Sequence, residues 1–227
     1  MIIYGKQTCF YVLQKHSNII EEIYFEKEIP KDIFRQFLAL NKPIIRLDSK
    51  KAQALAKGGN HQGYLLKINF KAESSFKILK DSSKIIVIVG ISDIGNIGSI
   101  FRTAYAFGID GIISTSKFNE NGVARVSSGA FFDMPYVVYK DYLSLANELK
   151  MSGFKLIGSS ANEVDSNNNI CFNKWALFLG SEGDGLPNRL LKRMDSILSI
   201  KMQNFDSLNV SVAAGILTYR MVTNGMY

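Results

Sequence analysis

The stretch Lys84-Ile85-Ile86-Val87-Ile88-Val89-Gly90 holds five consecutive apolar residues between a lysine and a glycine. A strand without a polar face is buried on both sides, which is typical of a parallel sheet covered by helices. Strand and helix patterns alternate from this stretch to the end of the sequence. The alternation predicts an α/β fold with a mostly parallel sheet for residues 84–227.

The further elements of this region are predicted from apolar runs and helical periodicity. After the strand at 84–90, we expect strands at 111–114, 136–139, 155–158, 176–180 and 197–200, and helices at 97–107, 142–151 and 210–222. No internal repeat or low-complexity segment is visible in the sequence.

Residues 1–68 are predicted to form a second, smaller α/β domain. Pro30 suits the first turn of a helix, and Gly58 with Gly59 suits the end of one. The stretch 69–83 carries Lys, Glu, Ser and Asp with few large apolar side chains, so we expect a linker there. The expected helices of the small domain are 7–15, 30–40 and 50–57, and the expected strands are 23–25, 43–46 and 64–68.

The composition is that of a globular protein: of 227 residues, 47% are hydrophobic and 21% charged. Cys9 and Cys171 lie far apart and outside any CxxC motif, and the only histidines are His16 and His61. A disulfide scaffold, a structural zinc site and a His-rich metal centre are therefore not expected. No apolar run approaches the ~20 residues of a membrane span, and no leader-type segment is visible. We expect a cytoplasmic protein without a membrane partner.

Positive charge is concentrated in the first third of the chain. Residues 1–70 contain 11 Lys and Arg against 6 Asp and Glu, and so carry +5 of the net charge of +7. A basic region of this kind favours phosphate-bearing partners such as nucleic acid. A solvated surface that is basic for no such reason explains the charge equally well.

Three polar, glycine-rich stretches follow predicted strands in the second domain. They are 92–102, with Asn96 and Arg102, then 180–187, with Glu182, and 207–211, with Ser207 and Asn209. Ligands of open α/β sheets bind outside the carboxyl ends of the strands, so these stretches are expected to meet at one edge. Each has a simpler explanation, such as a helix cap, a tight turn or a solvated arginine. Their joint occurrence favours a binding site.

The residue types indicate what such a site binds. Glycines allow a ligand to approach the backbone closely, and backbone N–H and C=O groups then read a polar ring. Arginine binds phosphate through its planar fork. The set predicts a nucleotide-like cofactor beside a phosphate-bearing substrate. The motifs GxGxxG, GxxxxGK(S/T) and GxSxG are absent, which disfavours a Rossmann dinucleotide site, a P-loop and a hydrolase elbow.

The same stretches carry a resemblance to a known family. The motifs are Asn96-Ile97-Gly98-Ser99-Ile100-Phe101-Arg102-Thr103-Ala104, Leu179-Gly180-Ser181-Glu182-Gly183-Asp184-Gly185-Leu186 and Ser207-Leu208-Asn209-Val210-Ser211-Val212-Ala213. With them, residues 84–227 resemble the SpoU/TrmH family of SPOUT-class RNA 2′-O-ribose methyltransferases. The first segment resembles the substrate-binding domain of many members, through Tyr4-Gly5-Lys6 and His61-Gln62-Gly63. The chain looks most similar to the branch that methylates guanosine in large-subunit (23S) rRNA.

The resemblance implies a deep C-terminal trefoil knot that binds S-adenosylmethionine, and a homodimer. The implied cofactor contacts are Gly180, Glu182, Gly183, Ile200, Met202, Leu208 and Asn209. The implied catalytic centre is Asn96, Arg102, Glu182, Ser207 and Asn209. The implied RNA contacts are Lys6, His61 and Arg102, although a structural turn explains His61 equally well.

The role of Arg102 stays open at this point. The family makes it the candidate for assisting removal of the hydroxyl proton, but a guanidinium is a poor base in water. It can instead organise phosphate and lower the pKa of the ribose hydroxyl electrostatically. Two departures from the family pattern affect nearby loops: Asp93-Ile94-Gly95 replaces an Asp-Pro, and Ile200-Lys201-Met202 replaces Ile-Pro-Met.

Two other functions compete with methylation of rRNA. The first is the same reaction on tRNA, which the basic N-terminal domain and the lack of a long basic extension after Tyr227 disfavour. The second is a non-catalytic RNA-binding protein, such as a ribosome assembly factor, which the full set of site residues disfavours.

Overall fold

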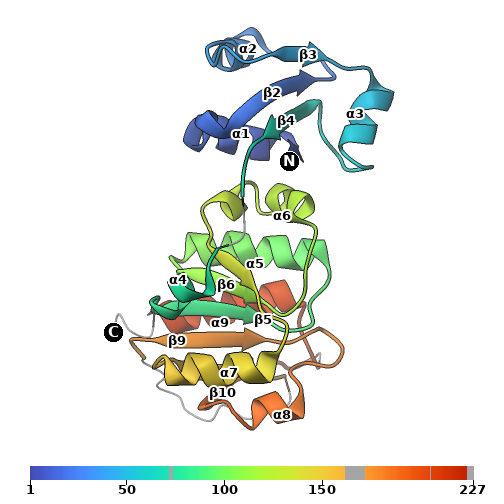
Figure 1. The fold of residues 1–227 in the computed structure, drawn as a ribbon. Helices are drawn as coiled ribbons and strands as arrows, with labels where there is room; N and C mark the ends of the chain where they lie inside the picture. The colour runs from blue at the N-terminus through green and yellow to red at the C-terminus, as the bar shows by residue number, and fades with distance from the viewer. Residues whose placement is uncertain (72–73, 162–171, 205, 224–227) are drawn as a thin grey trace.

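The computed structural model describes residues 1–71, 74–161, 172–204 and 206–223. They form two β-sheets, each built from its own part of the chain (Figure 1). The N-terminal sheet has the strand order β1-β4-β2-β3, and the C-terminal sheet has the order β10-β8-β9-β5-β6-β7. The predicted α/β class, with a small N-terminal α/β unit, is confirmed.

The N-terminal sheet mixes antiparallel and parallel pairs. Strand β4 pairs antiparallel with β1 and β2, while β2 pairs parallel with β3. Buried Phe25 and Phe37 lie in the core on one face, and Ala52, Ala56 and Leu65 pack together on the other. The elements are β1 (Ile2–Tyr4), α1 (Lys6–Lys15), η1 (Ser17–Ile19), β2 (Ile20–Phe25), α2 (Lys31–Leu38), β3 (Ile44–Arg46), α3 (Ser49–Leu55) and β4 (Tyr64–Ile68).

All strand pairs of the C-terminal sheet are parallel, as the apolar stretch at its centre predicts. Its strands are β5 (Lys84–Ile88), β6 (Gly111–Ser114), β7 (Tyr136–Val138), β8 (Lys155–Ser159), β9 (Trp175–Leu179) and β10 (Ser196–Leu198). Its helices are α5 (Ile94–Ala106), α6 (Glu120–Val126), α7 (Tyr142–Met151), α8 (Asn188–Leu191) and α9 (Val210–Thr223), with the short η2 (Ala130–Phe132).

Strand β5 shows why the sheet is covered on both faces. Ile86 and Ile88 belong to the core that contains the buried faces of α5 and α9, while Ile85 and Val87 belong to the core under α7 and α8. Alternate side chains of a strand point to opposite faces. These four side chains are at most 1% exposed, so the strand is buried between two layers of helices (Figure 1).

Helix α5 begins earlier than its apolar pattern predicts, at Ile94 instead of residue 97. The Asp93 side chain accepts a hydrogen bond from Asn96 N at 2.7 Å and so caps the helix. Ile94 occupies the first helical position, where the family pattern has proline and where proline is favoured. The cap therefore maintains the helix start without the proline, and it leaves the Asn96 side chain available for other contacts.

Helix α6 lies outside the predicted elements, because its seven residues are too few to show a helical period. It packs closely on α5 at Gly98, where an added Cβ would lie 2.4 Å from the Val126 Cβ. Only glycine permits this approach.

The stretch predicted as a linker, 69–83, contains the short helix α4 (Phe76–Lys80). Leu79 is fully buried in the core under α7, and Ser74 N donates a hydrogen bond to Tyr136 O at 2.8 Å. The Lys80 ammonium lies 2.6 Å from a Glu148 carboxylate oxygen on α7. This part of the stretch is thus packed on the C-terminal sheet. Its mostly polar composition predicts a linker because composition does not show that Leu79 is buried.

Helix α1 packs on α6 and connects the two sheets. Thr8 Oγ1 donates to Ala124 O at 3.3 Å, and His16 Nε2 lies 3.0 Å from Asp133 Oδ1. The Tyr11 hydroxyl also donates to Asp133. Burial, reinforced by the hydrogen bond to Asp133, raises the pKa of Tyr11.

Among the described residues, no helix combines the length and apolar character needed to span a bilayer. Within the same residues, no group of three or more His, Cys, Asp or Glu side chains is arranged to hold a metal ion. Cys9 is a free, buried thiol, and Cys171 lies outside the described residues.

Candidate active site

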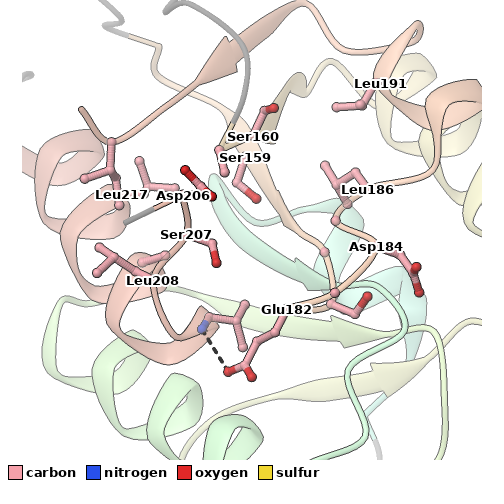
Figure 2. Close-up of a pocket in the computed structure, with 18 of the residues that line it drawn as sticks. Ser159, Ser160, Glu182, Asp184, Leu186, Leu191, Asp206, Ser207, Leu208 and Leu217 are labelled. Atoms are coloured by element: carbon pink, nitrogen blue, oxygen red, sulfur yellow. Dashed lines mark hydrogen bonds between the residues drawn. The ribbon is translucent and has the colours of Figure 1, made fainter. Parts of the chain in front are cut away.

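A cavity of about 440 Å³ opens where three strands of the C-terminal sheet end (Figure 2). Its volume falls within the range typical of small-molecule sites. The walls come from the segments after β8, β9 and β10 and from one face of α9. They comprise Ser159, Ser160, Ala161, Gly180, Ser181, Glu182, Gly183, Asp184, Gly185, Leu186, Asn188, Leu191, Ile200, Met202, Asp206, Ser207, Leu208, Val210, Ala213 and Leu217.

The loop after β9 folds back on itself at Gly180. Gly185 N donates to Ser181 O at 3.0 Å, and Gly185 has a left-handed φ of 64°. An added Cβ at Gly180 would lie 2.1 Å from the Gly185 carbonyl carbon. A side chain at Gly180 therefore cannot be accommodated without opening the loop.

The Glu182 carboxylate gathers residues from all three predicted motifs. Its Oε1 accepts hydrogen bonds from Asn96 Nδ2 at 3.0 Å and from Asn209 Nδ2 at 2.7 Å. It also accepts from Val210 N at 3.3 Å, at the start of α9, as Figure 2 shows. A carboxylate at a helix N-terminus is favoured by the helix dipole and by the free N–H groups.

Asn209 completes this network and caps α9. Its Oδ1 accepts hydrogen bonds from Ser211 N at 2.9 Å and from Val212 N at 3.4 Å. Its Nδ2 also donates to Asn96 Oδ1, at 2.8 Å. The Asn209 side chain therefore caps α9 and also contacts Glu182 of the cavity wall, while its role in catalysis stays a prediction.

The cavity lining divides into apolar and polar parts. Leu186, Ile200, Leu208 and Leu217 provide an apolar surface suited to a flat ring. Hydroxyl groups come from Ser159, Ser160 and Ser207, and acidic groups from Asp184 and Asp206 in addition to Glu182. Acidic groups around an otherwise uncharged cavity favour a ligand that carries positive charge.

All seven predicted cofactor residues lie at this site. Six line the cavity, namely Gly180, Glu182, Gly183, Ile200, Met202 and Leu208, and Asn209 contacts Glu182. Lys201, which replaces the proline of the family pattern, is exposed and is not part of the lining. Its neighbours on both sides still reach the cavity.

Of the predicted catalytic residues, the structure brings together Asn96, Glu182 and Asn209, and places Ser207 on the cavity wall. Arg102 stands apart from them. It lies six positions after Asn96 on α5, so the two residues are ~9 Å apart along the helix axis and point to different faces. The Arg102 guanidinium is exposed, and its Nη1 donates to Ser128 Oγ at 3.4 Å.

The predicted RNA contacts of the N-terminal domain lie close to one another. Lys6 is exposed, and its backbone N–H donates to Gln62 Oε1 at 3.0 Å. His61 is buried, and its Nδ1 accepts from Gly63 N at 3.1 Å. The His61 ring therefore stabilises the turn, and its contact with RNA stays a prediction.

Several residues of the cavity lie outside the set predicted from the sequence. Ser159, Ser160 and Ala161 directly follow a predicted strand, and this position is the signal that identifies them. Asp206 directly precedes the third motif. Leu217 lies one turn beyond Ala213 on the same helix face, as helical periodicity predicts.

Two family models match the chain and together cover most of it. The model of the SpoU rRNA Methylase family matches residues 83–219, which include all three motifs. The chain belongs to the SpoU family. A second model, described as "RNA 2'-O ribose methyltransferase substrate binding", matches residues 2–73. The resemblance drawn from the motifs is thereby confirmed for both parts of this SpoU-family chain.

Relatives and solved structures agree with this assignment. A Borreliella burgdorferi protein described as a tRNA/rRNA methyltransferase is 30% identical over 87% of this chain and 95% of its own length. The 23S rRNA (guanosine-2'-O-)-methyltransferase RlmB of Ralstonia nicotianae is 27% identical over 92% of this chain and 90% of its own. The SpoU methyltransferase AviRb of Streptomyces viridochromogenes, solved with AdoMet, has the same fold, with a TM-score of 0.78 at 19% identity over 100% and 90% of the two chains.

Substitution of Gly180 by alanine tests the construction of the cavity. We expect Gly180→Ala to lower the free energy of unfolding by about 1–3 kcal/mol, because the added methyl group overlaps the Gly185 backbone. Gly183→Ala is the matched control, since no atom lies within 4 Å of its added Cβ, and we expect a change within about 0.5 kcal/mol. Urea denaturation measures both values. Equal stability of the two variants would contradict the described loop.

Proposed function

We propose that this SpoU-family chain transfers a methyl group from S-adenosylmethionine to a ribose 2′-hydroxyl of RNA, and that the substrate is a guanosine of large-subunit rRNA. The observation that supports this most is the cavity at the strand ends. Its wall carries residues of the second and third family motifs, and Glu182 of that wall joins them to Asn96 of the first. A family match alone identifies the class, whereas this cavity provides a place for the cofactor.

The lining of the cavity fits S-adenosylmethionine. The apolar surface around Leu208 and Leu217 suits an adenine ring, and the backbone exposed at Gly180 and Gly183 suits its polar edge. The carboxylates of Asp184 and Asp206 suit a cofactor that carries a sulfonium and an ammonium group. When bound, the cofactor supplies an already activated methyl group.

Arg102 acts on the RNA in this proposal. Its exposed guanidinium binds phosphate beside the target ribose and holds the hydroxyl in line for transfer. Because a guanidinium retains its proton, its positive charge favours the oxyanion that develops as the hydroxyl loses its own proton. Ser128 accepts a hydrogen bond from Arg102 and limits the directions that the side chain can take.

The N-terminal part provides the RNA-binding surface. We assign residues 1–68 to this domain, 69–83 to the connecting segment and 84–227 to the methyltransferase domain, which includes the expected trefoil knot. Eleven basic residues within 1–70 favour binding of the phosphate backbone, with Lys6 among them. RNA as substrate is consistent with a protein that works in the cytoplasm.

Large-subunit rRNA is preferred over tRNA as the substrate because of one relative. A protein described as a 23S rRNA guanosine-2′-O-methyltransferase matches over 92% of this chain, so its similarity includes the N-terminal part. The family model over that part describes RNA substrate binding without naming an RNA class. A relative described by both RNA classes keeps tRNA as an outcome of the test.

The surface of α9 supports a homodimer. Val212, Ile216 and Tyr219 follow one another at helical spacing and are 50%, 43% and 57% exposed. The Tyr219 ring packs against Phe107, which directly follows α5, with the ring centroids 5.8 Å apart and the planes tilted by 56°. The apolar surface is therefore continuous with the helix that carries Arg102. Exposed apolar patches of this kind mark interaction sites in soluble proteins.

Methyl transfer with Arg102→Ala tests the proposed reaction. We expect the wild type to label one large-subunit rRNA nucleotide, on the 2′-oxygen, when rRNA from cells lacking the protein is supplied with labelled S-adenosylmethionine. The variant should lose at least about 100-fold in transfer rate. Its affinity for the cofactor, measured by calorimetry, should stay within about twofold because Arg102 does not line the cavity.

Arg189→Ala is the control, since Arg189 is also an exposed arginine of the C-terminal domain and does not line the cavity. Unchanged transfer by Arg102→Ala would contradict its role. Label that appears only in tRNA would overturn the substrate assignment. No label in either RNA, with cofactor affinity also absent, would favour the non-catalytic binding protein.

A charged substitution on the exposed apolar face of α9 tests whether this face forms the proposed homodimer interface. We expect the wild type to sediment as a dimer and Ile216→Glu to sediment as a monomer, because a carboxylate opposite its own copy is both desolvated and repelled. Met151→Glu is the control, since Met151 is 89% exposed on α7. Sedimentation velocity measures all three. A monomeric wild type, or a dimeric Ile216→Glu, would contradict the proposed interface.

A further inference from the structure

The N-terminal domain contains a second cavity, which the proposed reaction does not use. Its volume is about 360 Å³, and it lies where β2 ends and where the loop between α3 and β4 turns back. Its side chains are nearly all polar and include Glu26, Gln53, Asn60 and Gln62. A cavity of this composition suits a ligand with several hydrogen-bonding groups on one edge.

Glu26 is the one acidic residue of this lining. Its backbone N–H donates to Gly63 O at 3.1 Å, which holds the residue beside the loop. Its Oε2 is shielded from solvent and has no hydrogen-bond partner among the described residues. A shielded carboxylate oxygen without a partner is costly, and a ligand with N–H donors would remove that cost.

The loop that forms the wall is held in a defined shape. Lys57 and Gln62 have left-handed φ values of 50° and 54°, on either side of the segment that lines the cavity. The Gln62 side chain accepts from Lys6 N, and the His61 ring accepts from Gly63 N. These contacts fix the loop before any ligand binds, which lowers the ordering cost of binding.

We propose that this cavity captures one unpaired guanine base of the substrate RNA. The inference rests on the proposed function in that it takes RNA to be the substrate. Guanine presents N1–H and N2–H₂ side by side, and a carboxylate accepts from both, as other bases do not permit. Its O6 then accepts from an amide N–H of Gln53 or Asn60. Lys27, which lines the cavity, and Lys57 beside it are exposed and suit the adjoining phosphates.

The cavity is connected to the catalytic arginine through α6. Arg125 Nε donates to Asn60 O at 3.0 Å, on the loop that lines the cavity. Three residues further along the chain, Ser128 accepts from Arg102. In this proposal a base held in the cavity directs the next nucleotides of a single strand toward Arg102, and this would select which ribose is methylated.

The test is binding of short fluorescein-labelled oligouridylates that contain one central guanosine, adenosine or cytidine, or uridine alone. Fluorescence anisotropy is measured with the full chain and without cofactor. We expect the wild type to bind the guanosine oligonucleotide at least about fivefold more tightly than the others. Glu26→Gln should lose that preference, because an amide cannot accept from both donors.

Glu28→Gln is the matched control, since it removes the same charge from an exposed residue two positions away, and it should retain the preference. Gln53→Ala is a second variant at an exposed position, which should weaken binding of the guanosine oligonucleotide and leave the uridine one unchanged. A wild type without guanosine preference, or a Glu26→Gln and a Gln53→Ala that both retain it, would overturn the proposal.

This assay and the methyl-transfer assay can fail separately. Guanosine preference without methyl transfer would support the base pocket and count against the proposed reaction. Methyl transfer to rRNA without guanosine preference would support the reaction and overturn the base pocket.

Discussion

The arrangement of the C-terminal site depends on the hydrogen bonds that the Glu182 carboxylate accepts. This carboxylate holds Asn96, 86 residues away in the chain, together with Asn209 at the start of the last helix. Hydrogen bonds to a charged group contribute more than neutral ones, and here three N–H groups share one oxygen. The loop after β9, the first turn of α5 and the N-terminus of α9 are thereby fixed around one cavity.

The sequence predicts that the three motifs meet at one site, but it does not predict which side chains form hydrogen bonds with each other there. Polar loops after parallel strands must meet at one sheet edge, so the convergence of the three motifs follows from the strand pattern alone. The partners of each side chain do not follow. Asn96 has the residue type of a helix cap, yet Asp93 caps α5 and Asn96 binds Glu182. The choice depends on where α5 begins, and its apolar pattern starts three residues too late to show it.

The contacts between the two sheets could not be predicted from the sequence either. Helix 142–151 matches its prediction because it is long enough to show a helical period, whereas α6 is too short. Yet α6 carries Arg125, which contacts the N-terminal loop, and precedes Ser128, which contacts Arg102. Short elements that gain their stability from tertiary contacts are the ones that sequence periodicity misses. In this chain they connect the RNA-binding part to the methyltransferase part.

The dependence of the cofactor cavity on the Glu182 carboxylate is best tested by the affinity for S-adenosylmethionine with and without that carboxylate. Removal of the carboxylate in Glu182→Ala leaves the side-chain amides of Asn96 and Asn209 and the backbone N–H of Val210 without that acceptor, so the cavity wall loses its fixed shape. Isothermal calorimetry should give an affinity at least about tenfold weaker than that of the wild type, with the fold retained by circular dichroism. An unchanged affinity in a folded variant would show that the three motifs do not depend on this carboxylate.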